Sequence, residues 1–414
     1  MADSGDVDEY LSALVGRARD VLGDNLVGAY VAGSLALDAY QPGRSDIDAA
    51  LVTDHALTGS EKHELVAVLR HEALPVPARG LELVVYTRAT AQAGRPEPGF
   101  EVELNTGPEM TFRATYDPSD RPVADGRFWY ALDRSILSGI DAAALGPPAR
   151  EVFVDVDEED LRRLLVEALT WWLRQQGDPV DAVLGACRSL VRHREGVWLP
   201  KIAAAERLRA TGYRPAEVLD AAVAARLGTG PPPGKGEAAA LQRRVRSEIR
   251  GTRLRPLTEP DLDRLIELQE AGGVTGLGHV FPQDTNPFPR EQVAARWRAE
   301  IADRDTDALA VEVEGRLQGF VALHGDELLH FGTAVETWGT GLADDAHDLA
   351  VDRLAARGVR TARLWVFAEN GRALRLYQRL GWRPTGATRP TTFPPYPTLL
   401  AYELDLTGRA GASA

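Results

Sequence analysis

The sequence predicts a multidomain α/β protein. With 414 residues, the chain is long enough for two or three domains, each with its own hydrophobic core. Three short apolar runs near the N-terminus are typical of β-strands, and from Leu254 the pattern resets to a new series of strands and helices. The two halves differ in motif and strand order, so no internal repeat is present. We expect domains at residues 1–150, 151–251 and 252–414.

The first domain begins with three strand candidates. Leu26–Val31 and Ile47–Val52 are apolar and rich in β-branched or aromatic residues, which favours partly or fully buried strands. Leu81–Tyr86 has the same character but carries one acidic residue, Glu82. A lone acidic residue in a strand most often lies on its solvent face, and the alternative is that Glu82 has a chemical role.

A small-residue turn and two aspartates lie between these strands. Gly33-Ser34 follows the first strand, and Asp46-Ile47-Asp48 opens the second. Side chains alternate between the faces of a strand, so Asp46 and Asp48 point the same way and can converge on one cation. Magnesium prefers oxygen ligands, usually one or two carboxylates plus phosphates and water. Asp-x-Asp is also common in turns and helix caps, but the ordered set with Glu82 favours a metal and nucleoside triphosphate site.

This set resembles the nucleotidyltransferase superfamily, and within it the aminoglycoside adenylyltransferases of the streptomycin/spectinomycin type, over about residues 10 to 250. The resemblance implies a mixed-sheet nucleotidyltransferase domain joined to an all-α domain, with Mg²⁺ and ATP as cofactors. It makes Asp46 and Asp48 the metal ligands and Glu82 the catalytic base. The turn of Gly33 and Ser34 would cradle the triphosphate.

The resemblance extends into the helical domain through residues 168–201. It implies that Arg188 and Lys201 contact the phosphates of the nucleotide, and that Trp172 and Asp178 contact an aminocyclitol substrate. Core packing of an amphipathic helix is the alternative for one of the two tryptophans in this segment. A second acidic residue that the family places between Trp172 and Asp178 is absent, because Leu173–Gln176 contains no acid.

A proline and glycine run, Gly228 to Gly236, predicts a loop inside the helical domain. The following segment favours a basic amphipathic helix that ends near Gly251, which we take as the boundary. Beyond it we expect further elements in this order: a strand at Leu254–Leu257, a helix from Pro260 to about Glu270, and strands at Ala308–Glu314, Gly319–His324 and Glu327–Val335.

A glycine turn then leads from the last of these strands into a helix that runs to about Ala356. Glycines let the backbone approach a ligand closely, and the N–H groups at a helix start suit a pyrophosphate. A tight strand-to-helix turn is the structural alternative. The residues of this turn are Trp338, Gly339, Thr340, Gly341 and Leu342.

After another strand, Arg360–Phe367, the segment Glu369–Trp382 resembles the closing signature of the GCN5-related N-acetyltransferases (GNAT), and the similarity covers about residues 252 to 407. The resemblance implies an α/β GNAT domain that uses acetyl-CoA. The backbone of residues 338–342 would bind its pyrophosphate, Asn370 would contact its pantetheine arm, and Tyr377 would protonate the departing thiolate. An ordinary buried tyrosine is the alternative for Tyr377.

The sequence departs from the GNAT pattern at two places. Glu336 stands where many relatives carry Gln or Arg, and Asp344 and Asp345 lie in the first helical turn after the glycines. We expect these two carboxylates to favour the helix dipole but to repel a bound pyrophosphate. No general base stands out, and the candidates are His279, His324, His330 and Glu314.

Composition narrows the partners. The single cysteine, Cys187, rules out an intramolecular disulfide and fits a reducing compartment. The N-terminus lacks a signal-peptide pattern, and no apolar run is long enough to span a bilayer. A net charge of −14 and a pI near 5.2 argue against nucleic acid and favour a cationic small molecule. We expect a cytoplasmic protein that binds neither nucleic acid nor membrane.

The two resemblances together imply a bifunctional transferase acting in aminoglycoside resistance. The N-terminal part would adenylylate a drug hydroxyl with MgATP, and the C-terminal part would acetylate an amine with acetyl-CoA. Two alternatives stay open. The acceptor could be a protein or another metabolite, or the GNAT domain could be degenerate and serve as a sensor or scaffold.

Overall fold

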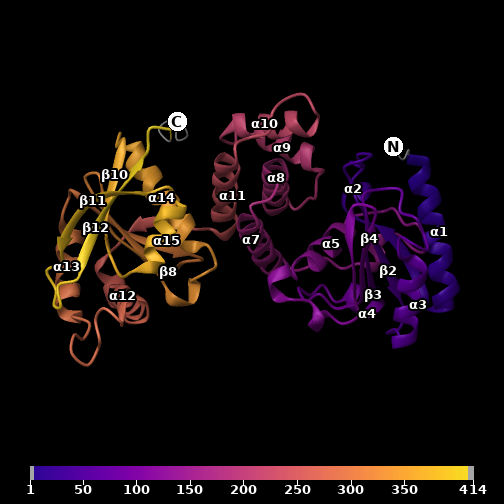
Figure 1. The fold of residues 1–414 in the computed structure, drawn as a ribbon, viewed down its shortest axis with the longest axis horizontal. Coiled ribbons are helices and arrows are strands. Elements are labelled where there is room, and N and C mark those ends of the chain that lie inside the picture. The colour runs from indigo at the N-terminus through magenta and orange to yellow at the C-terminus, as the bar shows by residue number, and fades with distance from the viewer. Residues whose placement is uncertain (1–3, 409–414) are drawn as a thin grey trace. The chain divides into compact units, whose positions relative to one another are not determined.

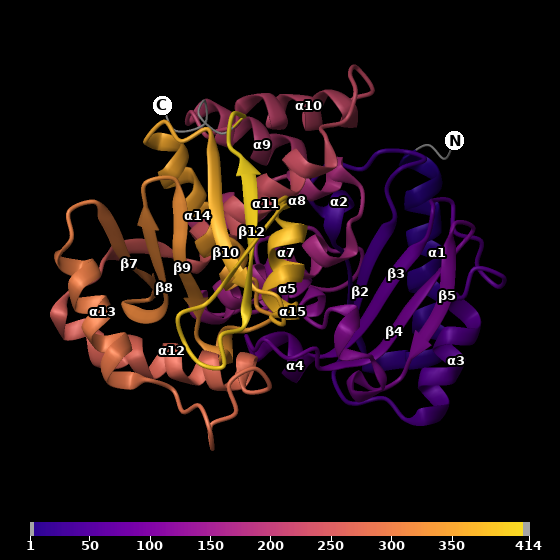
Figure 2. The same cartoon turned by 60° about the vertical axis from the view of Figure 1, so that its left-hand side comes forward.

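The computed structural model describes residues 4–408 and forms two compact units, residues 1–238 and 239–414 (Figures 1 and 2). Each unit contains one mixed sheet, and the first unit also contains a run of helices. The predicted fold class is therefore confirmed. Residues 1–3 and 409–414 of the predicted outer domains lie outside the described range. Among the described residues, no helix is long and apolar enough to cross a membrane.

The sheet of the first unit has five strands in sequential order. β2 and β3 are parallel, and the other neighbours are antiparallel. The strands are β1 (Leu26–Val31), β2 (Ile47–Thr53), β3 (Leu81–Thr87), β4 (Phe100–Gly107) and β5 (Met110–Thr115).

Alternate residues along the strands pack into two different hydrophobic cores, one on each face of the sheet. Ile47 and Leu51 of β2 pack under α1 (Ser4–Leu22) and α3 (Gly59–Leu69). Ala50 and Val52 point to the other face, where residues of α5 (Trp129–Leu137) and α6 (Ala149–Val152) cover them. Asp48 shares this second face by alternation. The short helices α2 (Gly33–Ala36) and α4 (Arg88–Gln92) complete the sheet connections.

Helices follow from residue 158 to residue 226. α8 contacts α7, α9 and α10, and α5 contacts α7. Apolar residues of α8, among them the buried Cys187, form the interior of this helical region. Burial raises the pKa of the Cys187 thiol to about 12. The bounds are α7 (Glu158–Gln175), α8 (Pro179–Glu195), α9 (Lys201–Ala210) and α10 (Ala216–Arg226).

The second unit has a seven-stranded sheet in the order β11-β12-β10-β9-β8-β7-β6. Its strands are β6 (Arg253–Pro256), β7 (Thr306–Val313), β8 (Arg316–His324), β9 (Glu327–Thr333), β10 (Thr361–Phe367), β11 (Arg383–Pro390) and β12 (Thr398–Asp405). Its helices are α12 (Leu262–Leu277), α13 (Arg290–Ala302), α14 (Leu342–Ala356) and α15 (Gly371–Arg379).

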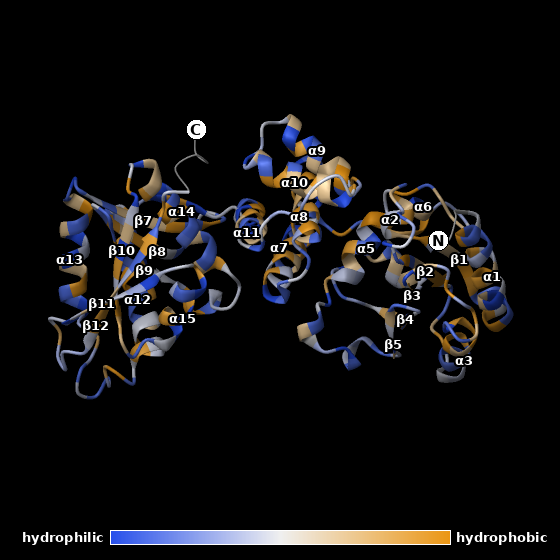
Figure 3. Cartoon of the chain, turned by 45° about the horizontal axis from the view of Figure 1, so that its top comes forward, coloured by the Kyte–Doolittle hydropathy of each residue, from blue (hydrophilic) through white to orange (hydrophobic). Residues whose placement is uncertain are grey.

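Two hydrophobic cores flank this sheet. One contains residues of α12 and α13, with Trp297 completely buried, and the other contains residues of α14 and α15. Many hydrophobic residues, coloured orange in Figure 3, lie in the strands. β9 and β10 pair in parallel through one register pair, Glu327 with Arg363. Their ladder therefore stops near the start of both strands.

Some elements differ from the sequence-based expectation. The strand expected over Glu327–Val335 ends at Thr333, because the 3₁₀ turn η5 (Val335–Thr337) follows it. The helix expected from Pro260 to Glu270 continues to Leu277 as α12. Strands β4, β5, β11 and β12 were not predicted, nor was helix α13.

The division between the two compact units falls inside α11 (Lys235–Arg250), after Ala238. The sequence instead places a boundary after Gly251, at the end of this helix. The predicted limits between residues 150 and 151 and between 251 and 252 stay predictions.

Candidate active sites

Three predicted carboxylates lie together on the sheet of the first unit. Asp48 of β2 and Glu82 of β3 are register partners in the parallel pair, so their side chains share one face. Asp46, two residues before Asp48, reaches the same face by alternation. The charge of Asp46 raises the pKa of both other carboxyls.

Gly33 and Ser34 lie against Asp48. Gly33 has a φ of 55°, and a Cβ atom there would lie 1.7 Å from Asp48 Oδ2, so only glycine fits. The backbone N–H of Ser34 donates a hydrogen bond to the Asp48 carboxylate. The predicted turn is thus in contact with the predicted metal ligand.

Crowding of negative charge raises the proton affinity of this cluster. Burial and the neighbouring Asp46 raise the pKa of Asp48 to about 6. Burial and the carboxylates of Asp48 and Asp133 raise the pKa of Glu82. Desolvation and like charge disfavour the ionised form, and a bound cation relieves the same repulsion.

Two aspartates fit Mg²⁺, which takes few protein ligands when phosphates supply the others. Within residues 4–408, no group of three or more His, Cys, Asp or Glu side chains could hold a metal ion. The two carboxylates of Asp46 and Asp48 would leave most ligand positions of Mg²⁺ open, and phosphate oxygens and water are the ligands that usually fill them.

Cationic side chains from two helices face the carboxylates. Arg188 of α8 and Lys201, the first residue of α9, both act on Asp48 to lower its pKa. Lys201 Nζ lies 2.6 Å from Asp181 Oδ1. Burial lowers the pKa of both cations. Arg188 also stands over Trp198, with its Cζ atom 5.8 Å from the ring centroid.

Several further charged residues lie at this site that the sequence does not predict. Asp133 of α5 acts on the pKa of Glu82 and Arg188, and burial and the charge of Asp48 raise its own pKa to about 7. Asp181 holds Lys201, and Arg79 Nη1 lies 4.0 Å from Asp46 Oδ1. An acidic residue inside the otherwise apolar start of α5 is the only sequence signal for Asp133.

The two predicted substrate residues lie in different surroundings. Trp172 belongs to an aromatic cluster, in which its ring centroid lies 5.4 Å from that of Trp171 and 6.1 Å from that of Trp129. Asp178 is the N-cap of α8, where its Oδ1 accepts hydrogen bonds from the N–H groups of Val180 and Asp181. A structural role thus accounts for Asp178, and its contact with a substrate stays a prediction.

The predicted glycine turn of the second unit joins η5 to α14. Gly339 and Gly341 have φ angles of 82° and 86°, the left-handed region that favours glycine. Trp338 donates from Nε1 to the carbonyl of Thr333 at 3.1 Å, and the guanidinium of Arg372 lies 3.3 Å from its ring centroid. Thr340 is exposed and Leu342 is buried. The turn presents the start of a helix of 15 residues.

Asn370 and Tyr377 both belong to the α15 region. Asn370 caps the helix, since its Oδ1 accepts from the N–H of Ala373 at 3.1 Å. Tyr377 is buried, with its ring 5.9 Å from that of Trp382, and burial raises its pKa well above the usual range. A high pKa is compatible with a proton donor, because the hydroxyl keeps its proton at neutral pH.

Arginines pair with the carboxylates of both Asp344 and Asp345, a contact that the sequence does not predict. The repulsion of a pyrophosphate by these two residues stays a prediction. Asp344 Oδ1 accepts from Arg379 at 2.7 Å, and Asp345 accepts from Arg246 and Arg250.

The candidate bases are partly explained by structural contacts. His330 Nε2 lies 2.8 Å from Glu300 Oε1, and His324 Nδ1 lies 3.0 Å from the Thr306 hydroxyl. His279 contacts the carbonyl of Glu369 at 3.2 Å. Glu314 occupies the turn between β7 and β8 with a φ of 53°. None of these contacts selects a base.

Residues 277–382 match the sequence profile of the acetyltransferase (GNAT) family, so this part of the chain carries a GNAT acetyltransferase domain. No curated protein matches the chain in sequence.

Three solved structures represent the structural matches. Spectinomycin adenyltransferase from Enterococcus faecialis, solved with ATP and spectinomycin, is 17% identical with a TM-score of 0.44, covering 58% of this chain and 98% of its own. Spermidine N-acetyltransferase from Vibrio cholerae, in complex with CoA and spermine, is 19% identical with a TM-score of 0.32, covering 38% of this chain and 97% of its own. An N-acetyltransferase from Staphylococcus aureus Mu50 is 17% identical with a TM-score of 0.31, covering 38% of this chain and 99% of its own.

Proposed function

We propose that the chain is a bifunctional transferase that adenylylates a hydroxyl group of a cationic small molecule with MgATP and acetylates an amine with acetyl-CoA. The observation that carries the first activity is the gathering of Asp46, Asp48 and Glu82 opposite Arg188 and Lys201. The second activity rests on the GNAT domain and its glycine turn.

In the first reaction, Asp46 and Asp48 would hold Mg²⁺, which when bound neutralises charge on the triphosphate. Lys201 and Arg188 would bind the phosphate oxygens and orient the leaving pyrophosphate. Glu82 would accept the proton of the attacking hydroxyl, and its raised proton affinity suits that task once substrate binds.

In the second reaction, the N–H groups at the start of α14 would bind the pyrophosphate of acetyl-CoA. The interrupted ladder between β9 and β10 leaves strand edges that an extended pantetheine arm could pair with. Asn370 would contact that arm, and Tyr377 would donate its proton to the thiolate sulfur as charge develops there.

The acceptor that we propose is an aminoglycoside or aminocyclitol, so that the reactions would confer antibiotic resistance in the cytoplasm. Such compounds carry both hydroxyls and amines, and their positive charge suits a chain with a net charge of −14. The aromatic cluster around Trp172 offers flat apolar surface to a sugar ring. Neither a polyanionic partner nor a membrane fits this charge.

The purified full chain should be given ATP labelled with ³²P at the α-phosphate together with Mg²⁺, or acetyl-CoA labelled with ¹⁴C in the acetyl group, with streptomycin, spectinomycin, other aminoglycosides and spermine as acceptors. We expect label from both donors on at least one drug. Label on a protein acceptor alone would overturn the resistance proposal. If ATP label reaches a drug while acetyl label reaches no acceptor, the GNAT domain acts instead as a sensor or scaffold.

Asp46→Asn should lower the rate of AMP transfer by about 10² or more, because one charge that holds the metal is lost, and leave acetyl transfer unchanged. Tyr377→Phe should slow acetyl transfer about 10²-fold, because the proton donor to the thiolate is lost, and leave AMP transfer unchanged. Asp54→Asn is the matched control, since Asp54 follows the same strand but pairs with Arg88 at the surface. Full AMP transfer by Asp46→Asn would refute the metal assignment.

A further inference from the structure

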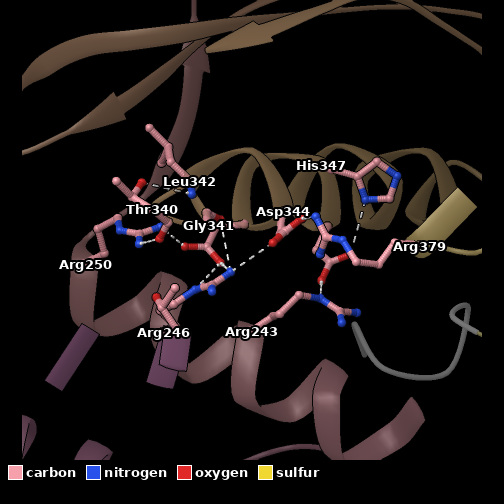
Figure 4. A network of polar contacts seen from close by, with 12 residues as sticks. Arg243, Arg246, Arg250, Thr340, Gly341, Leu342, Asp344, His347 and Arg379 are labelled. Atoms are coloured by element: carbon pink, nitrogen blue, oxygen red, sulfur yellow. Dashed lines mark hydrogen bonds and ion pairs between the residues drawn. The ribbon is translucent and has the colours of Figure 1, made fainter. Parts of the chain in front are cut away.

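Two arginines of α11 reach the glycine turn before α14. Arg246 Nη2 donates to the carbonyl of Gly341 at 3.0 Å, and Arg250 Nη2 donates to the carbonyl of Thr340 at 2.6 Å (Figure 4). The arginines are one helical turn apart, so both point to the same side of α11. Neither belongs to residues 277–382, which match the GNAT family. Two consecutive carbonyls of the turn are thus held by a helix outside the matched range.

Asp345 fixes both guanidinium groups in place. Its Oδ1 accepts from Arg246 Nε at 3.0 Å and from Nη2 at 2.8 Å, while its Oδ2 accepts from Arg250 Nη1. The side chain of Asp345 is 0% exposed and that of Arg246 is 1% exposed. Charge-assisted bonds of this kind are short and directional, so the arginines have little freedom to leave the turn.

Stability alone does not explain this network. Taking ions out of water carries a desolvation cost that their mutual attraction often only offsets. Burial lowers the pKa of Arg250 to about 10 and raises that of Asp345, as expected when charge is held inside protein. Apolar side chains of similar size could fill the same space, so the charged groups call for a role other than stability.

The geometry of the peptide bond indicates that this role is to orient the N–H groups of the turn. In a trans peptide, the C=O of one residue and the N–H of the next point in opposite directions. Holding the carbonyls of Thr340 and Gly341 toward α11 therefore directs the N–H groups of Gly341 and Leu342 away from it. The carbonyl of Gly341 also accepts a helical hydrogen bond from the N–H of Asp345 at 3.2 Å, and the N–H of Leu342 lies 3.4 Å from the hydroxyl of Thr340, a long contact that a pyrophosphate oxygen would replace. The first N–H groups of a helix have no acceptor inside the helix and are suited to bind an anion.

Gly341 is shaped for the same contact. A Cβ atom on this residue would lie 2.3 Å from Arg246 Nη1 and 2.4 Å from its Cζ. Because Gly341 has no side chain, the guanidinium of Arg246 can lie against its backbone. The ligand that the N–H groups would bind would lie on the opposite side of the turn. By contrast, a Cβ atom on Gly339 would meet nothing within 4 Å.

The local charge balance also favours an anion. At the turn itself, Arg246 and Arg250 both donate hydrogen bonds to one carboxylate, that of Asp345. The start of α14 adds the positive end of its helix dipole.

We infer that Arg246 and Arg250 are positioning residues of the acetyl-CoA site: they orient the glycine turn so that its N–H groups bind the pyrophosphate. This inference rests on the acetyl-CoA-dependent activity proposed above. It makes α11, which precedes the GNAT-matched residues, part of the machinery that binds acetyl-CoA.

The experiment is isothermal titration of the full-length protein with CoA, using Arg246→Met, Arg250→Met and the control Arg243→Met. Arg243 belongs to the same helix and network but pairs with Asp348 at 2.6 Å. Loss of either loop contact should weaken CoA binding about tenfold, because the N–H groups of the turn would no longer be held in the orientation that binds the pyrophosphate. Arg243→Met should change it less than twofold.

Kinetics with two acetyl donors separate positioning from folding. With acetyl-CoA, Arg250→Met should raise KM about tenfold and leave kcat within about twofold. With acetyl-pantetheine, which has no pyrophosphate, kcat/KM of the variant should equal that of the wild type. Arg250→Met leaves Arg246 on Asp345, so it tests the inference even if Arg246→Met does not fold. Arg250→Lys should recover part of the affinity, because it restores one donor and the charge.

Wild-type affinity for CoA in both loop variants would overturn the inference and leave the proposed acetyltransferase function intact. An equal loss with acetyl-pantetheine would also overturn it, because the defect would then be general. If the wild-type protein itself binds no CoA, the proposed acetyltransferase function fails first.

Discussion

Lys201 occupies a position that costs stability unless an anion lies near. It is the first residue of α9, where the helix dipole repels a positive charge. Asp181 offsets this repulsion at 2.6 Å, and Arg226 Nη1 lies 3.5 Å from the same oxygen. In spite of its burial, these cations hold the pKa of Asp181 below its usual range. A nucleotide phosphate could take over the role of this carboxylate.

Lys201→Met should raise KM for ATP about tenfold, because a charge-assisted contact to phosphate is lost. Lys62 provides the matched control, as its Nζ forms an ion pair with Glu101 at 3.2 Å. Initial rates of AMP transfer over a range of MgATP concentrations measure both variants. An unchanged KM for Lys201→Met would contradict its assignment to the phosphates.

At the scale of elements, the sequence predicts the strands whose residues form a clear apolar pattern, and it does not predict those without one. β1, β2 and β3 are largely apolar runs, interrupted by Asp48 in β2 and Glu82 in β3, and their sequence alone predicts them. All residues of β11 are exposed, so its sequence carries no alternation that could reveal a strand. The pairing of Asp345 with Arg246 spans 99 residues, and no local pattern encodes such a contact. The carboxylate trio was predictable for the opposite reason, since strand alternation and a resemblance both pointed to it.

The two glycines of the turn before α14 should respond differently to substitution. Gly339→Ala and Gly341→Ala share a positive φ, which costs about 1 kcal/mol for a residue with a side chain. Only at Gly341 would the new Cβ also collide with Arg246. We expect the free energy of unfolding to fall by about 1 kcal/mol for Gly339→Ala and by about 2–4 kcal/mol for Gly341→Ala. Urea denaturation measures both, and equal losses would argue against the close packing of Arg246.

The folding stability of the second unit is expected to depend on pH through an ion pair near its start. Two nitrogens of Arg255 each lie 2.8 Å from a carboxylate oxygen of Asp261, and this pairing lowers the Asp261 pKa to about 2. A carboxyl whose folded pKa lies below its unfolded pKa of about 3.9 stabilises the fold above that unfolded value, and the contribution is lost as pH falls toward the folded pKa.

The partly exposed Arg255–Asp261 pair should contribute about 1 kcal/mol above pH 5. Urea unfolding of the wild type and of Asp261→Asn should therefore differ by this amount at pH 6, and the difference should shrink as pH falls below 4. Glu259→Gln is the control, because its pairing with Arg298 is exposed. A difference that stays constant with pH would refute the linkage.

At the scale of the whole chain, α11 decides where the acetyltransferase unit can be separated. A fragment that begins at residue 252, the boundary that the sequence predicts, would lack Arg246 and Arg250, which pair with Asp345 in the full chain. Removing the partners of a buried charge costs about 3–5 kcal/mol. We therefore expect residues 252–414 to be poorly folded, whereas residues 235–414 should melt cooperatively. Circular dichroism melting of both fragments tests this, and equal stability would support the sequence-based boundary.

The buried thiol of Cys187 has a practical consequence for following motion. The chain contains one cysteine, and a buried thiol with a raised pKa reacts slowly with maleimides. Cysteines introduced at the exposed positions Ser60 and Ala356 would therefore accept fluorescent dyes selectively, without prior removal of the native thiol. Energy transfer between dyes at these positions would report, one molecule at a time, whether ATP or acetyl-CoA changes the distance between the two catalytic units.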